Sequence, residues 1–316
     1  MSTYRSIVTA ALLASVLFGC SNQDDSPVLR LGTNVWPGYE PLYLARELGK
    51  IDSKEVRLIE YPSASEVLRA FRNKTLEAAS LTLDEVIQLR QDNIPITIVL
   101  VHDISHGGDV ILANPMISNI KSLAGKKVAV EGNALGAYVL TRALEIHGMA
   151  LHDINLHSSD VNMHERLYIE KKVDAVVTFE PVRTKLLKHG AREIFTSREI
   201  PNEIVDVLVV HNNYLEQHPA RIKKLVDIWF DTIDYFEKNT QESASIISRR
   251  LKISPVEVVA GYDGLQMPTR EENVRLLRKS DGDLIVTLKN LGRVLEENNL
   301  VGKNVVIDGL ITEEFL

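Results

Sequence analysis

A buried strand that ends in a polar, glycine-containing tip constrains the fold of this chain more than any other stretch. Between residues 94 and 101 most positions on both faces are apolar, which is typical of an inner strand of an α/β sheet. The sequence HDISHGGD follows at residues 102–109, and a second apolar run leads away at residues 110–113. Open α/β sheets bind ligands at the carboxyl ends of their strands. We interpret this stretch as both a hinge between two lobes and a binding-site wall, with an ordinary strand–turn–strand as the alternative.

The composition predicts a folded globular protein. The 316 residues are 45% hydrophobic and 25% charged, which is enough for one large or two medium domains. The formal net charge is -7, and no long run of Lys or Arg occurs. These features argue against a nucleic acid as the main partner.

The first 20 residues predict an export signal of the lipoprotein type. One cation, Arg5, precedes an apolar segment at residues 7–18 that is too short for a comfortable membrane span. The segment ends in the sequence LFGC, which resembles the bacterial lipoprotein signal, and Cys20 is the only cysteine. We expect Cys20 to be lipidated and to anchor the chain on the periplasmic side of the inner or outer membrane, with residues 21–27 as a tether. The alternative is an ordinary cleaved signal.

The rest of the chain alternates strands and helices before it becomes mostly helical. Short apolar strands and amphipathic helices alternate from residue 28 to residue 210, and helical patterns dominate after His211. Two alternating blocks predict two α/β lobes. We expect lobe 1 to comprise residues 28–112 plus 211–316 and lobe 2 to comprise residues 113–210. The crossings are expected at the hinge stretch and at residues 207–212.

Four motifs in this order carry a family resemblance: GTNVWPGYEPLYLARELG, DISHGGDVILA, SLAGKKVAVEGNALGAYVLTRALE and VDAVVTFEPVRTKLLKHGAREIFTSREIPNEIVDVLVV. Together they resemble the periplasmic substrate-binding proteins of ABC importers, in the branch for nitrate, sulfonates, taurine and thiamine-precursor pyrimidines. The resemblance implies a type II periplasmic-binding-protein fold, with two α/β lobes joined by two hinge strands and a helical C-terminal tail. It also implies a monomer without a cofactor that delivers a small molecule to permease and ATPase subunits. A ligand-binding lobe of a membrane sensor is the alternative.

The candidate ligand-binding residues of lobe 1 lie at strand ends and helix starts: Trp36, Tyr39, Thr82, Asp84, Asp103, Ser105 and Asp109. The Trp36 ring could stack on a flat ligand or act as a hydrophobic staple, and Tyr39 could be core packing instead. Either Thr82 or Asp84 could cap a helix. Turn chemistry accounts for part of the polar tip, but its three polar side chains exceed what a turn needs.

The candidates of lobe 2 are Asn133, Leu135, Gly136, Glu180 and Asp206. Residues 133–138 join a strand to a helix, where free backbone N–H groups can bind an acceptor unless Asn133 caps the helix. Glu180 follows the strand VDAVVTF, so it either faces the cleft or stabilises a helix start. Asp206 interrupts an apolar run and must be paired or face a wet cleft.

The predicted cleft stretches contain no Lys or Arg, but they contain five acids: Asp84, Asp103, Asp109, Glu180 and Asp206. Burying an anion without a cationic partner is prohibitive. We therefore expect a flat, neutral-to-cationic nitrogen compound, such as an aminopyrimidine or an amidine, bound by Trp36, Glu180 and either Asp103 or Asp109. A sulfonate or nitrate ligand is the alternative.

The sequence predicts no catalytic and no metal site. The motifs G-x-S-x-G, H-E-x-x-H and G-x-x-x-x-G-K-[ST] are absent, and the single cysteine is assigned to lipid. His102 and His106 have the spacing of a metal pair on a helix, but they fall on a strand end and a turn. We expect a binding protein and not an enzyme.

Overall fold

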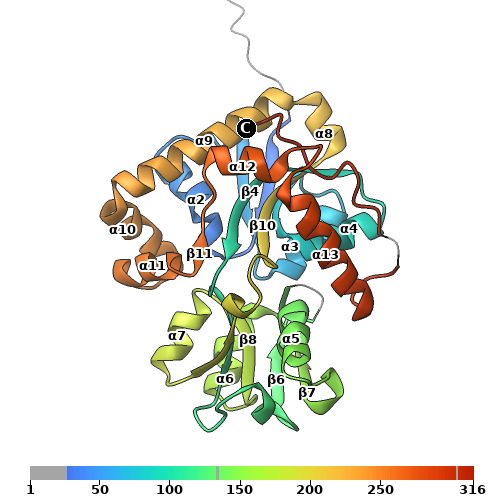
Figure 1. Cartoon of the computed structure of the whole chain (residues 1–316). Coiled ribbons are helices and arrows are strands. Elements are labelled where there is room, and N and C mark those ends of the chain that lie inside the picture. Colours follow the sequence, from blue (N-terminus) through green and yellow to red (C-terminus); the bar gives the residue numbers. More distant parts are fainter. Residues whose placement is uncertain (1–26, 133–134, 304) are drawn as a thin grey trace, which may run out of the picture.

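A computed structural model describes residues 27–132, 135–303 and 305–316, which form two α/β lobes, each built on its own sheet (Figure 1). The helices that follow His211 all belong to the larger lobe, which is the upper one in Figure 1. The predicted two-lobed α/β architecture with a helical C-terminal region is confirmed. The predicted signal segment with Cys20 and the candidate Asn133 lie outside the described residues.

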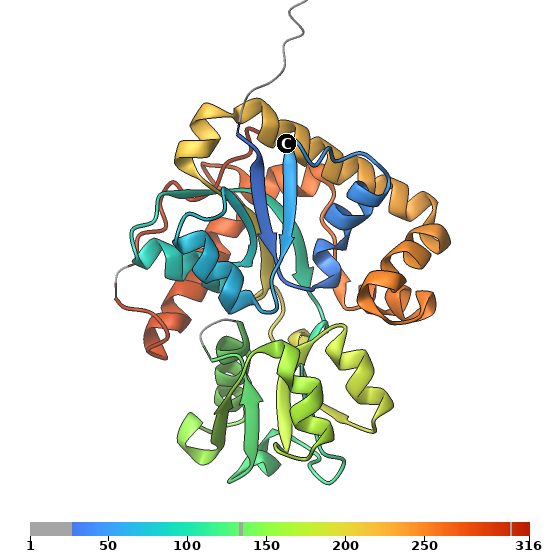
Figure 2. The same cartoon turned by 180° about the vertical axis from the view of Figure 1, so that it is seen from behind.

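The larger lobe contains a six-stranded sheet in the order β11-β4-β10-β3-β1-β2. Strand β1 pairs in parallel with β2 and β3, whereas β10 lies antiparallel between β3 and β4. Figure 2 brings β1 and β2 to the front. The strands are β1 (Leu29–Thr33), β2 (Val56–Glu60), β3 (Ala78–Thr82), β4 (Ile96–Ser105), β10 (Val205–His211) and β11 (Leu265–Gln266).

The smaller lobe contains a five-stranded sheet in the order β7-β6-β8-β5-β9. Strand β5 pairs antiparallel with β8 and β9, and β6 pairs in parallel with β7 and β8. The strands are β5 (Asp109–Ala113), β6 (Lys127–Val130), β7 (Asn155–Ser158), β8 (Ala175–Phe179) and β9 (Arg192–Thr196). All of them come from one contiguous part of the chain.

The first crossing between the lobes falls inside the predicted hinge stretch, whereas the second lies earlier in the chain than the predicted residues 207–212. The first is at residues 106–108, between β4 and β5, and the second is at residues 200–204, ahead of β10. Residues 207–211, expected to be a crossing, are buried within β10 in the larger sheet. This run is apolar because β10 is a central strand with neighbours on both edges, so the expected boundaries at 112/113 and 210/211 are wrong by a few residues.

The first crossing is held by backbone contacts with Gly264, the residue before the short strand β11, which the sequence did not predict. The Gly264 carbonyl accepts hydrogen bonds from the N–H groups of His106 (2.8 Å) and Gly108 (3.1 Å). A Cβ on Gly264 would lie 2.8 Å from the Gly108 nitrogen, so this approach requires a glycine. Gly107 has a φ of +114°, which only glycine adopts readily. The C-terminal segment thus fastens the hinge through its backbone.

The α-helices cover the faces of both sheets. Those of the larger lobe are α2 (Glu40–Glu47), α3 (Ala64–Arg72), α4 (Leu83–Gln91), α8 (Asn212–Gln217), α9 (Pro219–Lys238), α10 (Thr240–Leu251), α11 (Pro255–Tyr262), α12 (Arg270–Leu277) and α13 (Asp283–Glu297). Those of the smaller lobe are α5 (Leu135–Ile146), α6 (His164–Ile169) and α7 (Val182–Lys188). Short 3-10 helices include η2 (Pro37–Tyr39), η5 (Val161–Met163) and η6 (Ser197–Glu199). Within the described ranges, none of the helices combines the length and the apolar character that crossing a membrane requires.

Local sequence explains where helix α3 begins. The Ser63 side chain accepts a hydrogen bond from the Glu66 N–H (3.3 Å), and the predicted inward residues Val67, Leu68 and Phe71 of α3 are buried.

Helices α4 and α5 contact each other across the lobes, so buried side chains of both lobes form one apolar cluster. The structure therefore describes the lobes in a closed arrangement.

Candidate functional site

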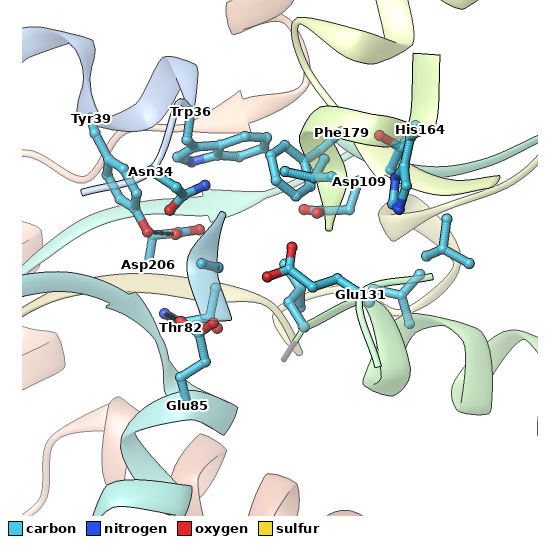
Figure 3. Close-up of a pocket in the computed structure, with 17 residues that line it drawn as sticks. Asn34, Trp36, Tyr39, Thr82, Glu85, Asp109, Glu131, His164, Phe179 and Asp206 are labelled. Carbon is cyan, nitrogen blue, oxygen red and sulfur yellow. Dashed lines mark hydrogen bonds between the residues drawn. The ribbon is translucent and has the colours of Figure 1, made fainter. Parts of the chain in front are cut away.

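A cavity lies between the lobes and is lined from both sides (Figure 3). It encloses about 540 Å³ of empty space, counted with the part that opens to solvent. The lining comprises 17 of the described residues: Asn34, Trp36, Tyr39, Ala64, Thr82, Glu85, Asp109, Glu131, Leu135, Gly136, Val139, Val161, His164, Val177, Thr178, Phe179 and Asp206. Enclosure by two lobes and a lining that combines apolar side chains with polar groups are the usual features of a small-molecule site.

The structure places seven of the predicted candidates in this lining: Trp36, Tyr39, Thr82, Asp109, Leu135, Gly136 and Asp206. Four others, Asp84, Asp103, Ser105 and Glu180, are buried nearby but do not line the cavity. The predicted strand ends and helix starts therefore meet at this cavity, although some of the polar residues at those ends do not line it.

Two aromatic rings meet across the lobes at one wall of the cavity. Trp36 comes from the larger lobe and Phe179 from the end of β8 in the smaller lobe. Their ring centroids are 5.6 Å apart and the rings are nearly perpendicular, at 89°. The indole Nε1–H donates a hydrogen bond to Asp103 Oδ2 (3.1 Å), so the carboxyl of Asp103 orients the ring from behind. This edge-to-face contact is one that aromatic pairs prefer.

Two buried acids, Asp103 and Asp206, lie beside each other on neighbouring strands. Asp206 of β10 pairs directly with Asp103 of β4 in the sheet register. The Tyr39 hydroxyl donates a hydrogen bond to Asp206 Oδ1, which Figure 3 shows as a dashed line. Burial, together with the charge of the neighbouring carboxyl groups, raises the pKa values of Asp103 and Asp206 well above the usual range. Each carboxyl group therefore disfavours the ionised form of the other.

The start of α4 presents a further carboxyl group to the cavity. Glu85 Oε2 accepts a hydrogen bond from the backbone N–H of Thr82 (2.9 Å), as in a capping box. The other oxygen, Oε1, has no hydrogen-bond partner among the described residues. Burial raises the pKa of Glu85 well above its usual range and that of Asp84 to about 6. Glu85 and not Asp84 lines the cavity, so the predicted candidate is one residue away from the observed one.

The glycine-containing tip contributes Asp109. The Ser105 hydroxyl accepts a hydrogen bond from the Asp109 N–H (3.3 Å) and contacts the Ser197 hydroxyl (2.8 Å), so Ser105 organises the turn. Asp109 Oδ2 is buried without a hydrogen-bond partner in the described part of the chain. Burial raises the pKa of Asp109 to about 7. An unpartnered buried carboxyl oxygen at a cavity is an acceptor available to a ligand.

Sequence reasoning missed Glu131, His164 and Phe179. Glu131 Oε1 accepts hydrogen bonds from the N–H (2.7 Å) and the hydroxyl (2.5 Å) of Ser65, and these bonds join the two lobes. Burial raises the pKa of Glu131. Glu131 and Phe179 both stand at the carboxyl ends of predicted strands, so the strand-end rule could have identified them. His164, at the start of the short helix α6, carries no such signal.

Glu180 was predicted to bind ligand, but its carboxylate is occupied within its own lobe. Its oxygens accept hydrogen bonds from Arg183 Nη1 (3.0 Å), from the Thr184 N–H (3.1 Å) and from the Thr184 hydroxyl (3.0 Å). The side chain thus stabilises the start of α7, which is the alternative that the sequence left open. The strand-end position was correctly recognised, but the local cap takes up the carboxylate.

The chemistry of the lining suits a ligand that is rich in hydrogen-bond donors. Four carboxyl groups line the cavity, and its described lining includes no Lys, Arg or Cys. His164 Nε2–H donates a hydrogen bond to the Ser159 carbonyl oxygen (3.2 Å), and burial lowers the pKa of His164 to about 4. The ring is therefore neutral, and its Nδ1 is an acceptor. Across the described residues, no group of three or more His, Cys, Asp or Glu side chains is arranged to hold a metal ion.

The chain matches a family model and proteins of related sequence. The sequence model of the NMT1-like family matches residues 22–250. A protein of Escherichia coli (strain K12) named for binding aliphatic sulfonates is 20% identical over 307 residues, which are 95% of this chain and 93% of that protein. The chain spans about half the length of another relative, named a binding protein, from Brucella abortus (strain 2308): they are 21% identical over 178 residues, 54% of each.

A solved structure has the same fold. The periplasmic aliphatic sulphonate binding protein SsuA from Escherichia coli superposes with a TM-score of 0.74 at 18% sequence identity. The match covers 90% of this chain and 97% of that one. Both lobes and the helical C-terminal region are therefore shared with a periplasmic binding protein.

Proposed function

Since the chain belongs to the NMT1-like family, we propose that it is an extracytoplasmic solute-binding protein that delivers a small molecule to an ABC-type permease. The observation that carries this proposal is the cavity whose walls come from both lobes. Trp36 and Phe179 meet across it, and Glu131 binds Ser65 across it. A ligand held there contacts both lobes at once, so its binding free energy stabilises the closed form, which a permease can distinguish from the open one.

We further propose a flat, neutral-to-cationic nitrogen compound as the ligand. The aromatic wall offers a surface for a planar ring, and the orphaned oxygens of Glu85 and Asp109 offer acceptors for N–H groups. An amidine or an aminopyrimidine combines both properties. The sequence predicted that Glu180 binds the ligand together with Asp103 or Asp109. Because the Glu180 carboxylate is bonded to Arg183 and Thr184, we assign the ligand contact to Asp109.

A sulfonate or nitrate is the second candidate. It is favoured by the names of the Escherichia coli relatives and by the start of α5, where Leu135 and Gly136 line the cavity and the positive end of the helix dipole suits an anion. Against it stands the lack of Lys and Arg in the described lining, which would leave a buried anion without a cationic partner.

A thermal-shift screen separates the two ligand classes. The processed protein is heated with amidines and aminopyrimidines and, in parallel, with taurine, an alkanesulfonate and nitrate. A compound at about 100 times its dissociation constant adds about 2.7 kcal/mol to the free energy of unfolding. A nitrogen compound is expected to raise the melting temperature. Stabilisation by a sulfonate or nitrate alone would refute the ligand class, and stabilisation by no small molecule would count against solute binding itself.

The proposal also covers the oligomeric state, the membrane anchor and the fate of the ligand. We propose that it is a monomer, that Cys20 holds it at the periplasmic face of a membrane, and that it releases its ligand chemically unchanged. The absence of Cys, Ser and Lys from the described lining supports a binding role over an enzymatic one. Mass spectrometry of the ligand after incubation tests this point. Co-purification with a permease, as opposed to a signalling receptor, separates an importer from a sensor.

A further inference from the structure

Asp109 presents to the ligand space a buried carboxyl oxygen, Oδ2, that has no hydrogen-bond partner among the described residues, while its carboxyl group also contacts the Ser105 side chain. It is the first residue of β5, where it pairs with Phe179 of β8 in the sheet register, so its position is set by the small sheet. Its side chain lines the cavity and is 2% exposed, and its Oδ2 has no hydrogen-bond partner among the residues described. The hydrogen bond from its N–H to Ser105 fixes the backbone and leaves Oδ2 free.

No positive charge on the described lining compensates this carboxyl group. The titratable groups that surround the cavity are Tyr39 from η2, Glu85 from α4, Glu131 after β6, His164 from α6 and Asp206 from β10, with Asp84 and Asp103 behind them. His164 is neutral, and the other groups are acids. An ionised Asp109 would therefore be a buried charge among like charges, which is costly. The carboxyl group keeps its proton instead, in agreement with a pKa raised by burial to about 7.

We propose that the cavity exchanges the carboxyl proton of Asp109 for a cationic N–H group of the ligand. This inference rests on the proposed function, because it specifies how that cavity takes up a nitrogen compound. The O–H bond of Asp109 breaks, its proton passes to solvent, and the N–H of the cation donates to Oδ2. One positive charge enters and one leaves, so the buried charge of the site stays constant. A neutral amine base would instead accept the proton itself, and no proton would reach solvent.

Titration calorimetry with acetamidinium chloride tests the exchange. The probe keeps its charge over the pH range used, so any proton that appears comes from the protein. The processed full-length protein is titrated at pH 6 in phosphate and in Bis-Tris, which both take up protons at this pH but have different ionisation enthalpies, and the difference in heat counts the protons released. We expect close to one proton per bound cation at pH 6 and an affinity that rises about tenfold from pH 5 to pH 6, since one proton is released. Asp109→Asn should abolish both effects, and the control Asp234→Asn, exposed on α9, should change neither.

A second measurement does not depend on the folding of a variant. Carbon-13 NMR of the aspartate carboxyl groups in the unmutated protein should show one that titrates near pH 7 without ligand and stays ionised with saturating acetamidinium. Binding without proton release and with an affinity independent of pH would overturn the exchange while leaving the nitrogen-ligand proposal standing. Proton release that persists in Asp109→Asn would overturn the assignment to Asp109. Binding of taurine with none of acetamidinium would overturn the ligand class itself.

Discussion

Lys188 and Glu257 form an ion pair that joins the two lobes, with Lys188 Nζ and Glu257 Oε1 2.5 Å apart. Lys188 ends α7 in the smaller lobe, and Glu257 lies in the first turn of α11 in the larger lobe, where the two helices face each other (Figure 1). Contact with Lys188 is the largest cause of the lowered pKa of Glu257, about 2. Because hinge opening would separate the two residues, this pair reports on closure.

Replacing Lys188 with Met should weaken ligand binding modestly. The closed form loses one exposed ion pair, so the dissociation constant should rise about two- to fivefold, and the difference should fade at high salt. The matched control is Lys185→Met, which removes a pair with Glu165 inside the smaller lobe. Calorimetry at low and high salt checks both variants. An equal loss in the control would show that closure does not depend on the Lys188 pair.

Replacing Phe179 with Ala should cost more affinity than Phe179→Leu. The ring contacts Trp36 edge-to-face across the lobes, and such pairs contribute about 0.5–1.5 kcal/mol beyond their buried area. We expect about a tenfold weaker complex for Ala and a smaller loss for Leu, which keeps most of the apolar volume. Small-angle scattering should show that the Ala variant contracts less when ligand is added. Full affinity in both variants would remove Phe179 from the site.

Replacing Asp109 with Asn should stabilise the ligand-free protein at high pH. A carboxyl group whose pKa is raised from 3.8 to about 7 on folding contributes its full stability below 3.8 and loses it as the pH rises through 7. Above pH 7 the wild-type chain therefore carries a buried charge that Asn avoids, worth up to about 4 kcal/mol. Denaturant unfolding at pH 5 and pH 8.5 tests the sign. A variant advantage that is larger at pH 5 than at pH 8.5 would contradict the burial of an ionisable Asp109.

Replacing Glu180 with Gln should lower stability without lowering affinity. The carboxylate is buried and binds Arg183, which also contacts Glu193 at 2.9 Å. Gln keeps part of the hydrogen bonding but leaves the guanidinium less well compensated, so we expect a loss of about 1–3 kcal/mol in the free energy of unfolding. Unfolding curves and calorimetry separate the two effects. Weaker ligand binding at unchanged stability would return Glu180 to the binding site.

Cys20 should become the lipidated amino terminus of the processed protein. It is the only thiol in the chain and follows the apolar segment of the signal. We expect processing to be sensitive to globomycin and Cys20→Ser to be released into the soluble periplasm. Processing that stays normal in Cys20→Ser, with the variant still bound to membrane, would disprove the anchor.

The alternation of strands and helices made most of the fold predictable, because each element carries its own periodicity. The position of β10 was not predictable in the same way. Its apolar run indicates a buried strand, but nothing in the run shows that it enters the larger sheet antiparallel between β3 and β4. The two-residue strand β11 leaves no periodic signal, because it is recruited by backbone hydrogen bonds to the edge of β4.

Prediction of the site succeeded where a strand end faces the other lobe and failed where a local partner intervenes. Asp109 and Asp206 were found because an acid next to an apolar strand needs an explanation. Glu180 obeys the same rule, but Thr184 and Arg183 lie one helical turn further on and bind its carboxylate. Glu85 was passed over for Asp84 because the direction of a side chain in the first turn of a helix depends on how that helix packs.

The place of β10 also shapes how the chain is assembled. Strands β3 and β4 are made early, yet their partner strand arrives only when residue 211 has been synthesised. Until then a nascent chain carries two apolar strands with unpaired edges, which are prone to pair with other chains. The smaller lobe, by contrast, draws its strands from a contiguous segment and can collapse through more local contacts. Pulse-labelled hydrogen exchange during refolding should therefore find β5–β9 protected before the centre of the larger sheet, which is the part of the newly made polypeptide that most needs shielding from aggregation.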